Sequence, residues 1–246
     1  MTATAAFSAL GDWKATRRTL HLYSRILSAV ARVYAEPHPK WWHVGLSVTA
    51  DGIETDKMAL PQGGTFWLVM DLKRHVIGLK TDDSFAAEFS MADGQSATEM
   101  GDRVLDAVGR LSAMGEYPRE RFENDEPTGY DPGAANRFLF VLTDVDRIFQ
   151  EHRDGLKGEV GPINFWPHGF DLSFEWYGTR VVEYEENDEA ASYPAQLNLG
   201  FYPGSPDNQA YFYSNPWPFE GEQLLDQELP RGAVWPTDGW GGTMLA

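Results

Sequence analysis

The sequence predicts an α+β fold in which antiparallel sheets pack against amphipathic helices. Apolar residues recur with the 3.6-residue period of a helix in some segments and with the two-residue period of a strand in others. Turn signals such as Asp51-Gly52 follow the strand-like segments and are typical of hairpins. The same order, a helix followed by strands that contain Trp, occurs twice along the 246 residues.

The first half of the chain predicts one long helix and a set of strands. Apolar residues mark one helical face over residues 13–34, and the prolines that follow at 37 and 39 end the helix. Residues 43–49 alternate apolar and polar side chains, as do residues 85–91, which is the pattern of a half-buried strand. Residues 66–72 are apolar on both faces, so this strand is expected to be central in its sheet.

A second and a third helix frame a polar segment. Ser96-Ala97-Thr98-Glu99 is a capping-box pattern that opens a helix ending near Gly115. Residues 116–129 are charged, contain proline and show no periodicity, so they are predicted to be a linker. Asp131-Pro132 is a helix start, and the next helix is expected to turn these residues inward: Phe138, Val141, Leu142, Val145, Ile148 and Phe149.

Strand patterns return after the third helix. Residues 170–177 alternate in the strand period, and Gly178 is expected to turn the chain. Residues 183–189 hold five acidic side chains, which predicts a solvated loop. Further strands are expected at 197–201 and 211–213.

The repeated order supports a duplicated helix-plus-sheet unit. The apolar positions of the first helix have the same spacing as those of the third, and residues 41–48 align with residues 165–172. The expected organisation is therefore a first unit at 1–115, a linker at 116–129 and a second unit at 130–246, packed together as one compact domain.

Composition excludes several functional classes. The chain has 20 basic and 37 acidic residues, a formal net charge of −17. Such a chain repels phosphate backbones and anionic membrane surfaces, so neither a nucleic acid nor a membrane is expected as a partner. There is no cysteine, no signal-peptide pattern at residues 1–6 and no apolar run near the ~20 residues that span a bilayer, and a cytoplasmic location is expected.

The most conspicuous candidate site is Trp41-Trp42-His43. Adjacent Trp residues on a strand point to opposite faces, so only one of the two is expected in the core. The other packs on the first helix, the simpler interpretation, or forms an aromatic wall beside His43. In that second case His43 is the hydrogen-bonding or proton-transfer group of the site.

Other candidates lie on the same predicted scaffold. His21 and Tyr23 are on the first helix, whereas Trp166 and His168 lie in the segment that aligns with residues 41–48. His168, between Pro167 and Gly169, also fits a simple turn. Asp171 and Glu175 share a strand face and are either a pair of acid–base groups or the solvated side of a sheet.

No motif for a metal, a phosphate loop, a dinucleotide or a serine nucleophile occurs, so neither a metal nor a cofactor is predicted. Nine Trp and a 13% share of aromatic residues favour an aromatic-walled pocket. The first hypothesis is a small-molecule-binding protein with candidate binding residues Trp41, Trp42, His43, His21, Tyr23, Trp166 and His168. The alternatives are an enzyme that pairs His43 with Asp171 and a non-enzymatic protein-interaction module. The sequence does not indicate an oligomeric state.

Several motifs resemble an uncharacterised bacterial family, domain of unknown function 5996. They are Thr19-Leu20-His21-Leu22-Tyr23, Lys40-Trp41-Trp42-His43-Val44, Val48-Thr49-Ala50-Asp51-Gly52, Tyr130-Asp131-Pro132, Phe165-Trp166, Gly169-Phe170-Asp171-Leu172 and Gly200-Phe201-Tyr202-Pro203-Gly204. They occur in the same order as in the family and span nearly the whole chain. The resemblance implies a shared architecture and brings no established activity, cofactor or catalytic residue.

Overall fold

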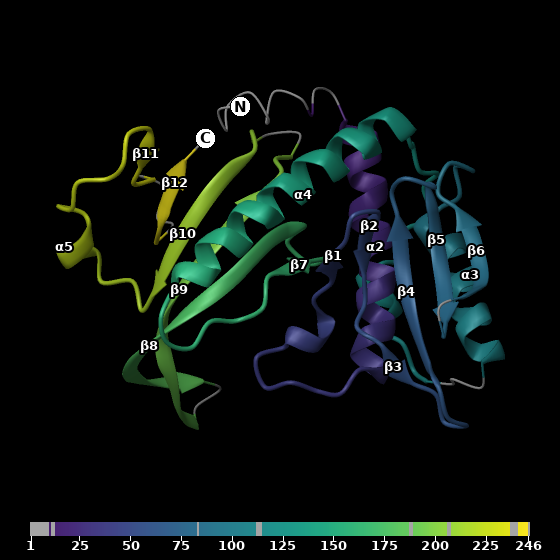
Figure 1. Ribbon diagram of the computed structural model, residues 1–246, viewed down its shortest axis with the longest axis horizontal. Helices are drawn as coiled ribbons and strands as arrows, with labels where there is room; N and C mark the ends of the chain where they lie inside the picture. Colours follow the sequence, from purple (N-terminus) through teal and green to yellow (C-terminus); the bar gives the residue numbers. More distant parts are fainter. Residues whose placement is uncertain are drawn as a thin grey trace. The chain divides into compact units, whose positions relative to one another are not determined.

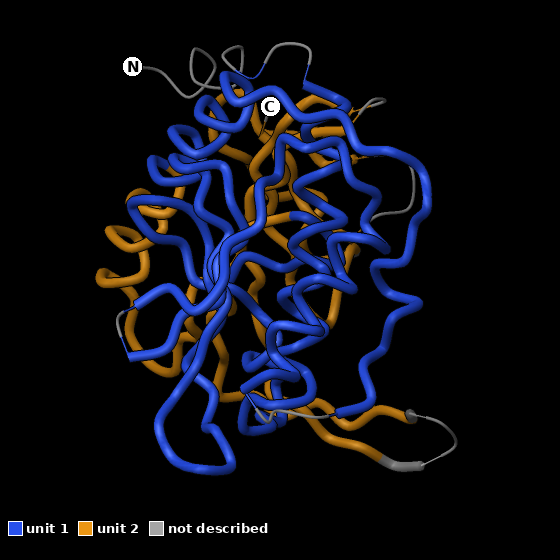
Figure 2. Tube along the Cα trace, turned by 90° about the vertical axis from the view of Figure 1, so that its right-hand side faces the viewer, with its two compact units in different colours: residues 1–144, 164–170 blue, residues 145–163, 171–246 orange. Residues whose placement is uncertain are grey.

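The computed structural model describes residues 10, 13–82, 84–111, 115–186, 189–205, 208–236 and 241–245. Helices and two antiparallel sheets make up this part of the chain, which confirms the α+β class. The chain divides into two compact units, coloured separately in Figure 2: unit 1 is residues 1–144 with 164–170, and unit 2 is residues 145–163 with 171–246. These limits differ from the expected ones at 115 and 130, because helix α4 (Pro132–Gly155) begins in unit 1 and ends in unit 2.

Two α-helices lie wholly within unit 1. Helix α2 (Lys14–Tyr34) confirms the first predicted helix, and its C-cap is Ala35, two residues before the first proline. Helix α3 (Ala97–Arg110) begins with the predicted capping box. Ser96 Oγ accepts the backbone N–H of Glu99 at 3.1 Å, and the Glu99 carboxylate accepts that of Ser96 at 2.8 Å. Two N–H groups that the first turn would otherwise leave unpaired are thereby satisfied.

The sheet of unit 1 is an antiparallel meander. Its strands are β1 (Ser47–Val48), β2 (Gly52–Glu54), β3 (Met58–Ala59), β4 (Thr65–Asp71), β5 (Val76–Thr81) and β6 (Ser84–Ser90), in the order β1-β2-β4-β5-β6 with β3 also paired to β4. Strand β4 is central and buried, as predicted. The turn at Asp51-Gly52 joins β1 to β2 through a hydrogen bond from the Thr49 N–H to the Gly52 carbonyl.

The two faces of this sheet are covered differently. Helices α2 and α3 lie against one face (Figure 1), where Phe66 of β4 meets the ring of Tyr34 edge-on at 5.4 Å. On the other face Trp67 lies under the side chains of Lys57 and Lys80, whose ammonium groups are 4.5 and 5.4 Å from its ring. Alternation along β4 therefore sends one set of side chains to the helices and the other to an aromatic surface covered by cations.

The predicted strand at 43–49 is only partly correct. Residues Trp42–Val44 form a 3-10 helix, η1, and only Ser47–Val48 are in a strand. Leu46 exchanges two backbone hydrogen bonds with Phe165, which lies in the short strand β7 (Asn164–Trp166) of the same unit. Residues 41–48 and 165–172 therefore differ in local conformation, since the second segment is a strand followed by a turn at 167–170. The duplication stays a prediction.

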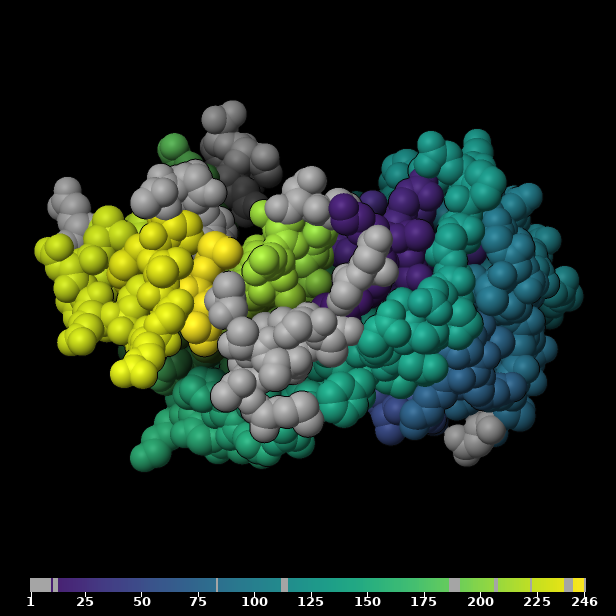
Figure 3. Space-filling view, turned by 90° about the horizontal axis from the view of Figure 1, so that it is seen from above, coloured from purple at the N-terminus to yellow at the C-terminus, as the bar shows by residue number. Residues whose placement is uncertain are grey.

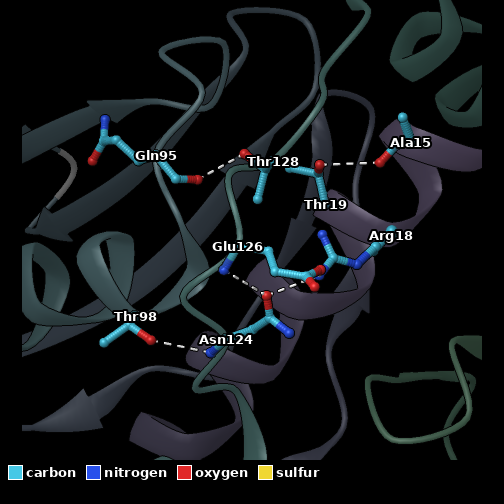
Figure 4. A network of polar contacts seen from close by, with 8 residues as sticks. All are labelled: Ala15, Arg18, Thr19, Gln95, Thr98, Asn124, Glu126 and Thr128. Atoms are coloured by element: carbon cyan, nitrogen blue, oxygen red, sulfur yellow. Dashed lines mark hydrogen bonds and ion pairs between the residues drawn. The ribbon is translucent and has the colours of Figure 1, made fainter.

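The segment 116–129 forms hydrogen bonds with helices α2 and α3 of unit 1 (Figure 4). It contains the 3-10 helix η2 (Arg119–Arg121). The side-chain oxygen of Asn124 accepts a hydrogen bond from Arg18 of α2 at 2.8 Å, and the backbone N–H of Asn124 donates to Thr98 Oγ1 of α3 at 3.1 Å. Thr128 donates to the carbonyl of Gln95 at 2.7 Å. Polar side chains thus hold a segment without periodicity in a defined position.

Unit 2 contains the end of α4, a short helix α5 (Gly221–Leu224) and a second antiparallel sheet. Its strands are β8 (Asp171–Glu186), β9 (Glu189–Tyr202), β10 (Tyr211–Trp217), β11 (Ala233–Val234) and β12 (Thr243–Leu245), in the order β11-β12-β10-β9-β8. Phe149 of α4 packs on one face of this sheet, with its ring 5.5 Å from Phe174 and 5.9 Å from Phe212.

Three predictions for this part of the chain are wrong. Strand β8 continues through Gly178, because its pairing with β9 shifts register between Tyr177 and Val181 without ending the strand. The acidic stretch forms the end of the β8–β9 hairpin, paired as far as Glu186 and Glu189, with residues 187 and 188 outside the described part. Ile148 is exposed rather than inward. Helix α4, to which it belongs, lies at the surface in the space-filling view (Figure 3).

Candidate functional site

A pocket of about 440 Å³ lies beside the most conspicuous sequence motif. It is in unit 1, where the chain leaves α2 and enters η1, and it is lined by Arg32, Pro37, His38, Pro39, Trp41 and His43. Trp41 and His43 were predicted for this role. Arg32 from the last turn of α2 and the Pro-His-Pro segment were not. We call this site the Trp41 pocket.

The Trp41 pocket owes its shape to a tight turn. The prolines at 37 and 39 keep the chain from continuing as helix. The N–H of Trp41 then donates to the carbonyl of His38 at 2.9 Å, and the N–H of Val44 to that of Trp41 at 3.1 Å. Trp41 closes the turn in the left-handed region, with φ of 60° and ψ of 14°. For a residue with a bulky side chain this conformation costs about 1–2 kcal/mol.

Trp41 is only partly packed. Its side chain is 55% exposed, the largest aromatic exposure recorded among the described residues. Its ring contacts the guanidinium of Arg32, at 4.8 Å, and the ring of His43, at 5.6 Å and an interplanar angle of 24°. A strained and exposed Trp is a residue that folding alone does not favour, and strain of this kind concentrates at functional sites.

His43 is buried and has a defined tautomer. Its Nδ1 accepts the backbone N–H of His38 at 3.1 Å, so in the neutral ring the proton is on Nε2. Burial lowers the pKa of His43, and the charges of Arg32 and His38 lower it further. At neutral pH the pocket therefore contains a neutral imidazole with one N–H donor.

Arg32 is the cation of the pocket. Its Nε is buried without a hydrogen-bond partner, and within the described part of the chain Arg32 forms no ion pair. Burial, followed by the charge of Arg121, lowers the pKa of Arg32, while Glu120 opposes the shift. None of the residues that line the pocket is a carboxylate. The enzyme hypothesis, which pairs His43 with an acid, finds no such partner in this lining.

Trp42 points away from the lining. Its ring stacks on His38 at 4.2 Å with an interplanar angle of 11°, and the Lys40 ammonium lies 5.4 Å from the centre of the same Trp42 ring. The argument that the two Trp residues alternate across a strand was wrong because η1 is helical. Trp42 instead fixes His38, which donates the N–H that orients His43.

The other candidates on α2 are not at this pocket. Tyr23 is fully buried, and its hydroxyl donates to the carbonyl of Gln95 at 2.9 Å. His21 lies against Phe170, with ring centroids 5.1 Å apart. Burial and the charges of Arg25 and Arg17 lower the pKa of His21 to about 4. Its Nε2 is buried and has no hydrogen-bond partner.

Trp166 and His168 belong to the same region as His21. Trp166 is buried on β7 and meets the ring of exposed His168 edge-on at 5.8 Å. Arg25 of α2 donates to the carbonyl of Pro167 at 3.4 Å and to that of His168 at 3.2 Å. This arrangement fastens the turn to the helix, and its histidine does not line the Trp41 pocket.

Asp171 lies in unit 2 and forms a local polar cluster. The hydroxyl of Tyr213 donates a short hydrogen bond to Asp171 Oδ2. Ser173, Gly200 and Tyr213 are neighbours in register across β8, β9 and β10, so the phenol crosses the strand between them. A side chain at Gly200 would come within 2.1 Å of the Tyr213 ring. Burial, then the charge of Asp171, raises the pKa of Tyr213 strongly, so the phenol stays protonated.

A second pocket in unit 1 is more polar. It has a volume of about 340 Å³ and is lined by Ser47, Glu54, Thr55, Asp56, Lys57, Trp67 and Lys80. Acids and bases are balanced in this lining, and its Trp is buried under the lysines. Burial raises the pKa of Glu54. Because the site neutralises its own charges, it offers less to a ligand than the Trp41 pocket.

Two further observations concern the described part of the chain. Three or more His, Asp or Glu side chains gather nowhere in it closely enough to hold a metal ion. None of its helices has both the length and the apolar character to cross a membrane.

A family model described as a family of unknown function (DUF5996) matches residues 8–245. The chain belongs to this family. The match confirms the resemblance that motifs such as Lys40–Val44 carry. No curated protein and no solved structure matches the chain. Because DUF5996 has no assigned function, the role of this DUF5996 chain has to be argued from its own residues.

Sequence reasoning missed Arg32 because a basic residue in the last turn of a helix also fits a simple interaction with the helix dipole. The part of His38 is not evident from the sequence, because a Pro-His-Pro segment also fits a simple helix end. A basic last turn followed by prolines and an exposed Trp is the combination that indicates the pocket.

Proposed function

We propose that this protein binds a small molecule with an aromatic or flat apolar body in the Trp41 pocket. The observation that carries the proposal is Trp41 itself, which is left-handed and more than half exposed. Its conformation costs free energy and the exposed part of its ring adds nothing to packing, so a role outside folding accounts best for a Trp at this position. The neighbouring rings of His38 and His43 add an aromatic wall.

The size of the pocket agrees with a small ligand. A volume of about 440 Å³ lies within the range of roughly 300–1,000 Å³ that is usual for small-molecule sites. Apolar walls with a few polar groups are also usual, and here the polar groups are the guanidinium of Arg32 and the imidazole of His43.

Binding of aromatic fragments tests the proposal. Indole and 4-methylphenol, with cyclohexanol as a non-aromatic comparison, are titrated and followed by saturation-transfer NMR. We expect the aromatic fragments to bind. Trp41→Gly should lower their affinity about tenfold or more, because stacking of a flat ring on an aromatic side chain is worth about 1–3 kcal/mol. The control is Trp176→Phe, which removes a partly exposed indole elsewhere. Equal affinity of wild type and Trp41→Gly for the fragments would reject the pocket. So would the absence of binding at roughly 10 mM fragment, a concentration that corresponds to a binding free energy of about −2.7 kcal/mol.

A further inference from the structure

We propose that the ligand of the Trp41 pocket carries an oxyanion, a carboxylate or a phosphate, which binds to Arg32 beside the aromatic body on Trp41. The inference rests on the proposed function and adds the chemical class of the ligand. It follows from the charges and hydrogen-bond donors that the pocket leaves uncompensated.

Arg32 has a buried donor without an acceptor in the described part of the chain. Its Nε is buried without a hydrogen-bond partner, and no ion pair involves it in the described residues. Removing a cationic N–H from water without giving it an acceptor is costly. A bound oxyanion would supply the missing opposite charge.

The guanidinium of Arg32 contacts the ring of Trp41. Its central carbon, Cζ, lies 4.8 Å from the ring centre, which is a cation–π contact. Such a contact forms no hydrogen bond, so it takes up none of the N–H donors of the guanidinium. They form the fork that pairs with two oxygens of a carboxylate or phosphate.

His43 adds a neutral donor. His43 Nδ1 is occupied by the His38 N–H, so the proton of the neutral ring is on Nε2. His43 and Arg32 both line the pocket and both contact Trp41. One charged and one neutral donor beside an aromatic surface complement an oxyanion attached to a flat ring.

The charge at the Trp41 pocket differs from that of the chain as a whole. The chain as a whole has a net charge of −17 and repels anions. At this pocket the lining itself carries a cation, Arg32, and no carboxylate, and the charge of Arg121 reaches Arg32 from outside it. Glu120 is the acid that acts on Arg32 from outside the lining. Anion binding is therefore expected at this pocket against the overall charge of the protein.

Matched ligand pairs provide the test. The probes are benzoate with benzamide and phenyl phosphate with phenol, together with inorganic phosphate alone, titrated into the full chain by NMR. We expect each anion to bind about tenfold or more tightly than its neutral partner, which is the effect of one charge-assisted pair. The larger of the two ratios decides between a carboxylate and a phosphate. Raising the salt concentration should weaken the anions and spare the neutral probes.

Variants assign the effect to Arg32. Arg32→Gln should reduce the preference for anions to about twofold or less while neutral probes bind as before. Arg147→Gln is the control, because it removes an exposed arginine paired with Glu151 on α4. Arg32→Lys keeps the charge without the planar fork and should give an intermediate preference. Thermal unfolding by circular dichroism shows that each variant is folded, and Arg32→Lys replaces Arg32→Gln if the latter unfolds.

The outcomes separate the two proposals. Equal affinities for charged and neutral members of a pair would overturn the anion site and leave aromatic binding at Trp41 in place. A preference for anions that survives both Arg32 variants would also overturn it, since the anion would then bind elsewhere. If no aromatic probe binds, charged or neutral, the proposed function itself is rejected.

Discussion

Two aromatic residues of unit 1 share an uncommon backbone conformation in opposite environments. Trp41 and Phe170 both have positive φ, 60° and 56°. Phe170 is completely buried and stacks on Phe138 at 5.5 Å, so burial of a large ring offsets its strain. Trp41 has no such burial. At the scale of single residues the same backbone strain therefore serves packing in one case and a surface site in the other.

Glycine substitution at both positions tests this difference. Trp41→Gly relieves left-handed strain of about 1–2 kcal/mol and loses only surface contacts, so the free energy of unfolding should stay within about 1 kcal/mol of wild type. Phe170→Gly relieves the same strain but empties part of the core, and it should destabilise by about 3 kcal/mol or more. Urea unfolding measures both variants. A similar loss for the two would mean that Trp41 is a structural residue.

At the scale of elements, the sheet of unit 2 depends on one missing side chain. Gly200 of β9 lets the Tyr213 phenol cross the strand and reach Asp171 on β8. Any Cβ at Gly200 would overlap the ring at 2.1 Å. The hydrogen bond and the packing of three strands are thus coupled through a single position.

A double-mutant cycle measures that coupling. Gly200→Ala should destabilise the protein by about 1–3 kcal/mol, because the ring has to move and its hydrogen bond breaks. In a Tyr213→Ala background the same substitution should cost much less, since nothing remains to be displaced. Thermal or urea unfolding of the four proteins gives the interaction energy. Additive effects would contradict the crossing of Tyr213 over Gly200.

Elements with a local cause could be predicted from the sequence. The capping box at Ser96 and the hairpin turn at Asp51-Gly52 depend on neighbouring residues, and both occur as expected. The β8–β9 hairpin was missed because its register shift and strand partners are set by residues far along the chain. Glu183 and its neighbours look like a loop by charge, yet a paired hairpin tolerates exposed charges on its surface.

The candidate site was predicted in part for the same reason. Trp41 and His43 stand out because they are close in sequence, whereas Arg32 joins them only because α2 ends two residues after it and the chain folds back. Grouping His21, Tyr23 and Trp166 with them assumed one site. The structure places Tyr23 at Gln95 and His21 at Phe170, because residues two positions apart on a helix face different sides.

At the scale of the whole molecule, one buried histidine links stability to pH. The pKa of His21 falls from 6.5 to about 4 on folding, through burial first and then the charges of Arg25 and Arg17. Between these values the unfolded chain binds a proton at His21 that the folded chain does not. Stability therefore rises with pH across this window and is lost as pH falls from about 6.5 towards 4.

The expected size of this effect is measurable. Between pH 7 and 5 the wild type should lose about 2 kcal/mol more of its unfolding free energy than His21→Gln, which has no imidazole to protonate. His152→Gln, at an exposed position of α4, is the matched control and should follow the wild type. Urea unfolding at several pH values gives the curves. Parallel curves for wild type and His21→Gln would show that His21 is not desolvated in the folded protein.

The pairing of Leu46 with Phe165 has a consequence for the order in which the protein is made. Unit 1 takes its last pieces from residues 164–170, including the buried rings of Phe165 and Phe170, which pack on Phe138 at 6.3 and 5.5 Å. A nascent chain that has emerged only as far as residue 144 carries the sheet and the helical segments of this unit without the strand that completes its core. We expect the first unit to close late, after most of the chain has left the ribosome, and fragments that end before residue 164 to be poor substitutes for it.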